Sequence, residues 1–234
     1  SLDSARTLVT VALEDTLDTS QIYPVHIHAN DVDSTGPIAV PLGAIDNAAR
    51  RAGRSVHVVP RPLDSLRAFD GHINLHEQAM PLDTVLAQGN MGSNASAQPT
   101  LFQLQRAEPD TATYALVPVA NNRPEAPDGI GGRIRFEALT PASTLVEVRR
   151  SARAPATNQT HPVHLRRNSA NAGGDIAFYL GALSGSPRGA QSSWKVVPRS
   201  FSELVAFDGH VRIHWSNDNL DVVLGQGDIG ANAP

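Results

Sequence analysis

Histidine is the residue type whose spacing in this chain is best suited to chemistry. The sequence holds nine histidines, and four of them form two close pairs, His26 with His28 and His72 with His76. Residues two or four positions apart project from the same face of a β-strand. If the strands that carry the two pairs are neighbours, four imidazoles converge, a ligand set that suits Zn²⁺ or Cu²⁺ without any thiolate.

A second, weaker set of histidines occurs in the other half of the chain. His164, His210 and His214 repeat the spacing of the first set, but Arg166 stands where the fourth histidine is expected. His161 could take the missing place only if its loop folds inward. The first set is therefore the preferred metal candidate, with copper or zinc as the ion, and no other cofactor is expected.

Each of these histidines also has an ordinary structural interpretation. A strand histidine can lie on a solvated outer face, or it can orient a loop with one ring nitrogen donating and the other accepting. Because spacing alone is weak evidence for a metal, this structural role is the first expectation and the metal is the second. His57 falls in no such pattern and is expected to be an ordinary surface residue.

Other motifs that could carry chemistry lack essential parts. The glycine runs at 88–92 and 226–230 have no P-loop lysine and no following helix, so we expect tight turns with positive φ. The loop with Asp31 and Asp33 has no bidentate glutamate at EF-hand spacing and is expected to be solvated. No serine has a nucleophile-elbow context. We therefore expect a protein that is not an enzyme.

The composition indicates a globular protein without nucleic-acid partners or a membrane span. Hydrophobic residues make up 41% of the 234 residues, and the net charge is −4, with scattered basic residues rather than a basic stripe. No apolar run approaches the roughly 18 residues of a transmembrane helix. Cysteine is absent, so disulfides and thiolate metal sites are excluded.

The chain repeats itself at a constant offset. Segment 23–95 aligns without a gap on 161–233, 138 positions later, and about 33 of the 73 positions are identical. This predicts two domains, 1–98 and 99–234. Strand-like runs at 113–119 and 132–139 have no counterpart in the first copy, which begins at 7–11. We expect the first domain to lack its two leading strands and to be completed by Leu101 to Leu104 or by a neighbouring subunit.

Alternating polarity predicts that both copies are built from strands. Val25 and Ile27 alternate with His26 and His28, the period of a half-buried strand. One short helix per copy is expected. In the second copy it starts with a capping box of Ser200 and Glu203, and in the first copy with Pro62 at the first helical position. The predicted fold is all-β, with two antiparallel, Greek-key-like β-sandwich domains that each carry one short helix.

Five blocks that recur in order in both copies resemble the CHRD domain family, named for its repeats in chordin. In the second copy they read HPVHLR, GDIAFYLGA, VVPR, AFDGHVRIH and LDVVLGQGDIGANA. The resemblance covers about Thr111 to Ala233 and most of the first copy. It implies an extracellular β-sandwich without known catalysis. A distant likeness to the Cu/Zn superoxide dismutase sandwich lacks the cysteine pair, the zinc-loop ligands and the active-site arginine context.

These features lead to two functional hypotheses. The first is a secreted or cell-surface, non-catalytic binding or structural module, with a protein or polysaccharide surface as its partner or with copies of itself joined by strand complementation. The second is a copper- or zinc-binding protein that uses the histidines of the first domain. The start at Ser1, without a signal core, fits an exported chain whose signal peptide has been removed. Triplets at Asn94 and Asn158 match the glycosylation pattern, which often arises by chance.

Overall fold

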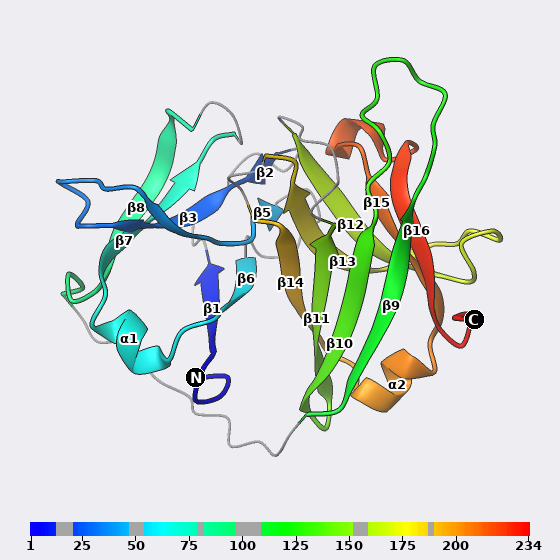
Figure 1. Cartoon of the computed structure of the whole chain (residues 1–234), viewed down its shortest axis with the longest axis horizontal. Coiled ribbons are helices and arrows are strands. Elements are labelled where there is room, and N and C mark those ends of the chain that lie inside the picture. The colour runs from blue at the N-terminus through cyan, green and yellow to red at the C-terminus, as the bar shows by residue number, and fades with distance from the viewer. Residues whose placement is uncertain (13–20, 47–53, 79–81, 97–108, 152–158, 187–189) are drawn as a thin grey trace.

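Antiparallel β-strands make up most of the protein, and its only regular α-helices in the described part are two short ones (Figure 1). The computed structural model describes residues 1–12, 21–46, 54–78, 82–96, 109–151, 159–186 and 190–234. The all-β fold predicted from the alternating pattern is confirmed. Among the described residues, no helix has the length and apolar character needed to cross a membrane.

The first repeat contains eight of the strands and one helix. In chain order these are β1 (Thr7–Ala12), β2 (Ile22–Tyr23), β3 (Val25–Ala29), β4 (Ile38–Pro41), β5 (Ile45–Asp46), β6 (Arg54–Val59), α1 (Leu63–Arg67), β7 (Asp70–His76) and β8 (Val85–Gly92).

The second repeat contains the other eight strands, the second α-helix and one 3-10 turn. In chain order these are β9 (Thr111–Pro118), β10 (Gly132–Thr140), β11 (Ser143–Arg150), β12 (Thr160–Arg167), β13 (Ile176–Ser184), β14 (Ser192–Val197), α2 (Phe201–Val205), β15 (Asp208–His214), η1 (Asn217–Asn219) and β16 (Val223–Gly230).

The two repeats fold alike, element for element. β6, α1, β7 and β8 each begin 138 positions before β14, α2, β15 and β16. The strand register is copied too, because Val25 lies opposite Leu75 in one repeat and Val163 lies opposite Ile213 in the other. Even an unusual backbone conformation recurs, since Asn30 and its counterpart Asn168 both have positive φ, 65° and 61°. The sequence repeat is therefore a structural repeat.

Each repeat encloses its own hydrophobic core between facing strands. In the first, Val25 and Ile27 on β3 pack with Val59 on β6 and with Leu66 on α1. In the second, a larger cluster includes Phe136 on β10, which has no counterpart in the first repeat. Burial of such apolar side chains is the main force that holds a sandwich together. The core faces of β3 and β12 force the alternating histidines onto the opposite, outer face.

β9 and β10 join two halves of the second repeat that remain separate in the first. They run between β16 and β11 in a sheet of order β1-β6-β14-β11-β10-β9-β16-β15-β12-β13. In the described part of the first repeat, β8 pairs with β7 alone and β1 pairs with β6 alone. No strand of the described part of the first repeat takes the place of β9 and β10. Leu101 to Leu104, the segment expected to fold back, lies outside the described residues.

The two repeats are joined edge to edge through a pair of strands. β6 and β14 are equivalent strands, and they pair with each other antiparallel through Val56 and Trp194. Those two residues are themselves 138 positions apart, so the junction is nearly two-fold symmetric. Interfaces that use the same patch on both partners are typical of symmetric dimers.

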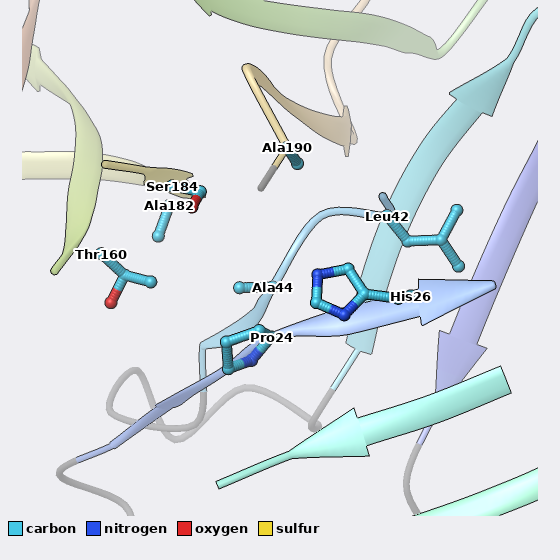
Figure 2. A pocket seen from close by; sticks show the side chains of 8 residues that line it. All are labelled: Pro24, His26, Leu42, Ala44, Thr160, Ala182, Ser184 and Ala190. Atoms are coloured by element: carbon cyan, nitrogen blue, oxygen red, sulfur yellow. The ribbon is translucent and has the colours of Figure 1, made fainter. Parts of the chain in front are cut away.

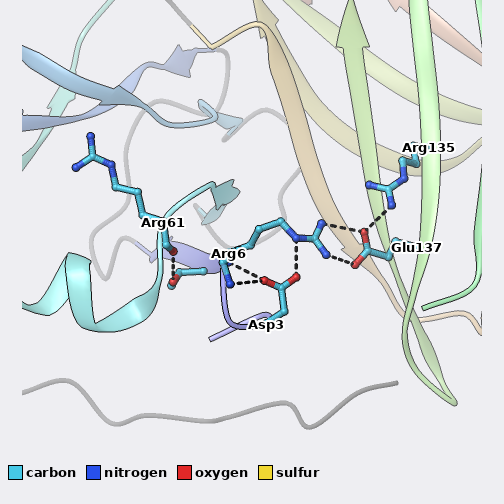
Figure 3. Close-up of polar contacts among 7 residues, drawn as sticks. Asp3, Arg6, Arg61, Arg135 and Glu137 are labelled. Atoms are coloured by element: carbon cyan, nitrogen blue, oxygen red, sulfur yellow. Dashed lines mark hydrogen bonds and ion pairs between the residues drawn. The ribbon is translucent and has the colours of Figure 1, made fainter. Parts of the chain in front are cut away.

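The N-terminal segment of the first repeat packs against the second repeat and forms an ion pair with it. Leu2 is fully buried in a small cluster with Val58 and Leu145. Beside it, the Arg6 guanidinium donates two hydrogen bonds to the carboxylate of Glu137, at 3.0 and 3.2 Å, and another to Asp3 at 2.7 Å (Figure 3). Glu137 is only 1% exposed, so the ion pair compensates a charge that is otherwise costly to bury.

The two helices begin differently, as their sequences require. Ser200 accepts a hydrogen bond from the Glu203 backbone N–H while the Glu203 carboxylate accepts one from the Ser200 N–H, so the predicted capping box is confirmed. Pro62 is the N-cap of α1 and not its first helical residue, which corrects that detail of the prediction. It offers no side-chain cap, because proline has no polar side-chain atom.

Candidate metal centre

The two histidine pairs of the first repeat lie on adjacent strands, as a shared site requires. β3 pairs antiparallel with β7, which sets His26 opposite Asn74 and His28 opposite His72. His76 lies two residues beyond Asn74 on the same outer face. The sequence had allowed for a solvated outer face. In the structure this face is not solvated, because the four histidines are only 0–8% exposed. Burial without solvent makes each ring nitrogen dependent on a specific partner.

Three of these four histidines form a compact triad. His26, His28 and His76 each offer a ring nitrogen, and these nitrogens all lie within 4.8 Å of one another. The ring centroids are 5.1 Å apart for His26 and His76, and 5.9 Å apart for His28 and His76. Among the described residues this is the one group of three or more potential ligands. We call His26, His28 and His76 the first-domain triad.

Each ring of the triad has at least one buried nitrogen without a hydrogen-bond partner among the described residues. His28 makes a 3.0 Å hydrogen bond from Nδ1 to the Gly36 carbonyl, which must be the acceptor, so Nδ1 carries the proton and Nε2 presents its lone pair. That Nε2, the Nδ1 of His26 and both ring nitrogens of His76 are buried without a hydrogen bond. A ring nitrogen fixed by a carbonyl on its other side is the usual arrangement of a metal-ligating histidine.

The spacing of the triad fits a metal ion after a small adjustment. Three nitrogens no more than 4.8 Å apart lie at most about 2.8 Å from a common centre, and zinc–nitrogen bonds measure about 2.0–2.1 Å. Closing the difference requires shifts of less than about 1 Å, which side-chain torsions supply. Three neutral imidazoles with no thiolate suit copper or zinc and leave at least one coordination position open.

His72, the fourth histidine expected at this site, is not part of the triad. Its Nδ1 is hydrogen bonded to the Asn30 carbonyl at 2.7 Å, and its ring stacks on His28 with centroids 5.3 Å apart. It therefore holds the loop 30–37 against the sheet and supports the His28 ring from the side. The sequence alone could not separate this supporting role from ligation, because both require an outer-face imidazole.

Burial keeps two rings of the triad, His26 and His76, neutral and ready to bind a cation. Desolvation, followed by the neighbouring His76 and His28, lowers the pKa of His26 to about 3. Desolvation likewise lowers the pKa of His76, with His28 adding to the effect. The Leu82 carbonyl lies near the His76 ring and partly offsets this lowering, without reaching hydrogen-bond geometry. At neutral pH both rings are unprotonated, the form that binds metal.

His26 faces a small pocket at the junction of the two repeats. Figure 2 shows its ring beside Ala44 and Leu42 of the first repeat, with Ala190 and Ser184 of the second on the far side. The pocket thus brings the edge of the triad to the boundary between the repeats. A ligand that reaches the triad from this side would contact both of them.

The corresponding cluster of the second repeat lacks a triad in the described structure. His164 and His214 are in ring contact at 4.8 Å, but Arg166 occupies the place of His28 and donates its Nε–H to the Gly174 carbonyl at 2.8 Å. His210 repeats the role of His72, with its Nδ1 bonded to the Asn168 carbonyl at 2.7 Å. The weaker metal candidates therefore fail to assemble three ligands.

Several other sequence expectations are corrected. His57 is buried, not on the surface, and its ring lies 6.3 Å from Trp194 at the junction of the repeats. His161 does not complete the second cluster, because its Nδ1 bonds the Trp215 carbonyl. The glycine runs lie within β8 and β16 and are not turns; of their glycines only Gly92 and Gly230, at the strand ends, have positive φ.

Some residues that shape these clusters were missed. The carbonyls of Gly36 and Leu82 carry no signal in the sequence, because any residue offers a backbone oxygen. Arg212 could have been recognised, since it lies between His210 and His214 on the same face of one strand.

Comparison of the chain with family models, with curated proteins and with solved structures finds no match.

Proposed function

We propose that this protein is a non-catalytic binding module whose first repeat holds one copper or zinc ion through His26, His28 and His76. One observation carries the proposal: a ring nitrogen of each of these imidazoles lies within 4.8 Å of the other two, and each ring has a buried nitrogen without a hydrogen-bond partner among the described residues. A buried polar group without a partner costs about 1–3 kcal/mol. A metal ion would satisfy all three rings at once.

The electrostatics of the covering loop support a cation. Asp31 and Asp33 lie on the loop that folds over the cluster, and no arginine or lysine occurs on β3 or β7. Asp31 is close enough to His72 for the two to interact, and hydrogen bonds from Ser34 keep the pKa of Asp31 low. A carboxylate near neutral ligands raises the local concentration of cations.

Metal analysis of the whole chain tests this proposal directly. After removal of metals with a chelator and addition of Zn²⁺ or Cu²⁺ in separate arms, we expect one equivalent to remain bound through dialysis. His76→Ala should lose it, and His57→Ala, a buried histidine at the junction of the repeats and outside the triad, should keep it. Nitrogen hyperfine structure in the copper spectrum would count the imidazoles. No retained ion, or equal retention by both variants, would contradict the proposal.

A second candidate function is association through the outer edge of β8, which pairs only with β7 among the described strands. Val85 and Leu86 on β8 are 40% and 42% exposed, whereas their counterparts on β16 are more deeply buried, and β16 is paired with β9. An unpaired strand edge with exposed apolar side chains accepts a strand from another chain. We infer that copies of this protein assemble there into a homo-oligomer or filament, as a structural module.

The resemblance of the five repeated blocks to CHRD domains supports an extracellular or cell-surface setting for either function. A protein or polysaccharide surface is then an alternative partner for the same edge. Light scattering over a concentration series tests self-association. Mass should rise with concentration in the wild type and fall toward the monomer in Leu86→Lys, because a charged edge residue opposes strand addition. A strict monomer at every concentration would rule out self-assembly.

A further inference from the structure

The second repeat keeps the histidine frame of the triad but changes its charge. Across β12 and β15, His164 lies opposite Arg212 and Arg166 lies opposite His210. The equivalent positions in the first repeat hold His26 opposite Asn74 and His28 opposite His72. Side chains directly opposed on a sheet have Cβ atoms about 4.5–5.5 Å apart. Two guanidiniums therefore alternate with imidazoles on one face.

The loop above this cluster has lost its acidic residues. Asp31 and Asp33 of the first repeat correspond to Ser169 and Asn171 in the second. At the exposed base of the loop the second repeat gains one arginine, Arg167, and one aspartate, Asp175. The net charge of the base is therefore unchanged. The surroundings that favour a cation in the first repeat are thus absent from the second.

One acidic residue is gained inside the cluster, and it does not neutralise it. Asp228 replaces Asn90 and lies opposite His210. Its carboxylate accepts a 2.6 Å hydrogen bond from the Ala170 backbone N–H. No ion pair links it to Arg166 or Arg212 among the described contacts. Two gained arginines against one gained aspartate leave the cluster more positive than its counterpart.

Several polar atoms of the cluster are buried without a hydrogen-bond partner among the described residues. Arg212 Nε and one ring nitrogen of His214 are donors, whereas His210 Nε2 is an acceptor because its Nδ1–H is bonded to the Asn168 carbonyl. The guanidiniums are nonetheless anchored, because Arg212 donates to the Ala170 carbonyl at 2.9 Å and Arg166 to the Gly174 carbonyl. Burial, with Arg166 and Arg212 as further contributors, lowers the pKa of His214 to about 4. The two guanidiniums therefore make the cluster repel added positive charge, and Arg212 Nε and the His214 ring offer donors to an anion.

Solvent can reach the cluster through its arginines. His210 and His214 are buried, but Arg166 and Arg212 are both partly exposed. An incoming anion would meet the guanidiniums first and the imidazoles behind them. Guanidinium groups bind oxyanions through paired N–H donors, and such charge-assisted bonds are stronger than neutral ones.

We propose that Arg166, His210, Arg212 and His214, the second-domain cluster, form a binding site for a tetrahedral oxyanion of the phosphate or sulfate class. The duplicated sites of the chain have then diverged toward ligands of opposite charge. The inference does not depend on metal binding in the first repeat, since none of its residues belongs to the first-domain triad.

Titration of the metal-free full chain with inorganic phosphate, at ionic strength held constant with chloride, tests the site. We expect saturable one-site binding by calorimetry and selective shifts of the His210 and His214 ring signals in NMR spectra. Arg212→Asn introduces the residue found at the equivalent position of the first repeat, Asn74, and should weaken phosphate binding at least about tenfold. Arg149→Asn removes the same charge from the exposed face of β11 and should change it less than about twofold.

Competition with other anions identifies the class of ion that the site binds. Sulfate, which is tetrahedral, should displace phosphate, and acetate should not displace it. Arg166→His introduces the residue that the first repeat has at this place and is a second, independent variant. Its melting temperature shows whether the variant is still folded. Absence of saturable binding would overturn the proposal. Equal weakening by Arg212→Asn and Arg149→Asn would do so as well, since binding would then follow net charge alone.

Discussion

Arg166 lies directly opposite His210, in the place where His28 lies opposite His72 in the first repeat. The two strand pairs share their register, and both supporting histidines hold a loop carbonyl at 2.7 Å. The exchange of His28 for Arg166 is therefore the change that leaves two convergent imidazoles in the second repeat, where the first repeat has three. This makes the chain its own internal comparison, because each site can be converted toward the other without disturbing the scaffold.

Installing the missing imidazole should create a second metal site. In Arg166→His, the new ring joins His164 and His214, already 4.8 Å apart, in the arrangement of the first-domain triad. Bound metal should rise from one to two equivalents per chain by elemental analysis.

Affinity at this second site should be the weaker one, because Arg212 still repels a cation. The double variant Arg166→His/Arg212→Asn should therefore bind more tightly than the single one. Metal content that stays at one equivalent in both variants would show that three imidazoles in this arrangement are insufficient.

Acid should destabilise the metal-free protein well before its carboxylates titrate. Burial lowers the pKa of His26 and His164 to about 3 and that of His57 and His214 to about 4, from a usual value of 6.5. The unfolded chain takes up these protons first, so stability is full above pH 6.5 and is lost as pH falls toward the folded values. At pH 5 each such histidine costs about 2 kcal/mol.

Urea unfolding in chelator at pH 7.5 and pH 5 measures this loss. His57→Phe should reduce the difference between the two pH values, because it removes one of the titrating rings from the junction. A free energy of unfolding that stays constant between pH 7.5 and pH 5 would contradict the prediction.

Breaking the N-terminal ion pair should loosen the junction of the repeats. Arg6→Ala leaves Glu137 buried with Arg135 as its remaining ionic partner, at 3.2 Å. Removing one partner of a buried pair is costly, and we expect a loss of about 1–3 kcal/mol in the free energy of unfolding.

Arg67→Ala is the matched control for that variant. Its partner Asp64 is 91% exposed, so the loss should be less than about 0.5 kcal/mol. Thermal or urea melts of both variants compare the two values, and equal losses would show that the Arg6 contact is as weak as a surface pair.

The helix caps provide a smaller test of local stability. Ser200→Ala removes the bonds that Ser200 Oγ makes with Glu203, while the bond from the Ser200 backbone N–H can remain, and it should cost about 1 kcal/mol, the usual value of an N-cap. Ser202→Ala, on the exposed side of the same helix, should cost less than about 0.5 kcal/mol. A Ser200→Ala protein that melts like the wild type would mean that α2 is held by the packing of Phe201, Leu204 and Val205 and not by its cap.

The sequence by itself determined the repeat, the strands and helices, and which residues of a strand share a face. A period of two and a constant offset are local properties, so Val25 and His26 could be assigned to opposite faces without coordinates. The absence of two leading strands from the first repeat was likewise visible, since runs at β9 and β10 had no counterpart upstream of β1.

Only the tertiary structure decided which histidines meet and how the repeats join. His28 and His72 have the same spacing pattern, yet loop carbonyls and strand register place one in the triad and the other beside it. The burial of His57 and the pairing of Val56 with Trp194 depend on contacts between segments 138 positions apart. Such contacts follow from packing and not from local propensity, and periodicity carries no information about them.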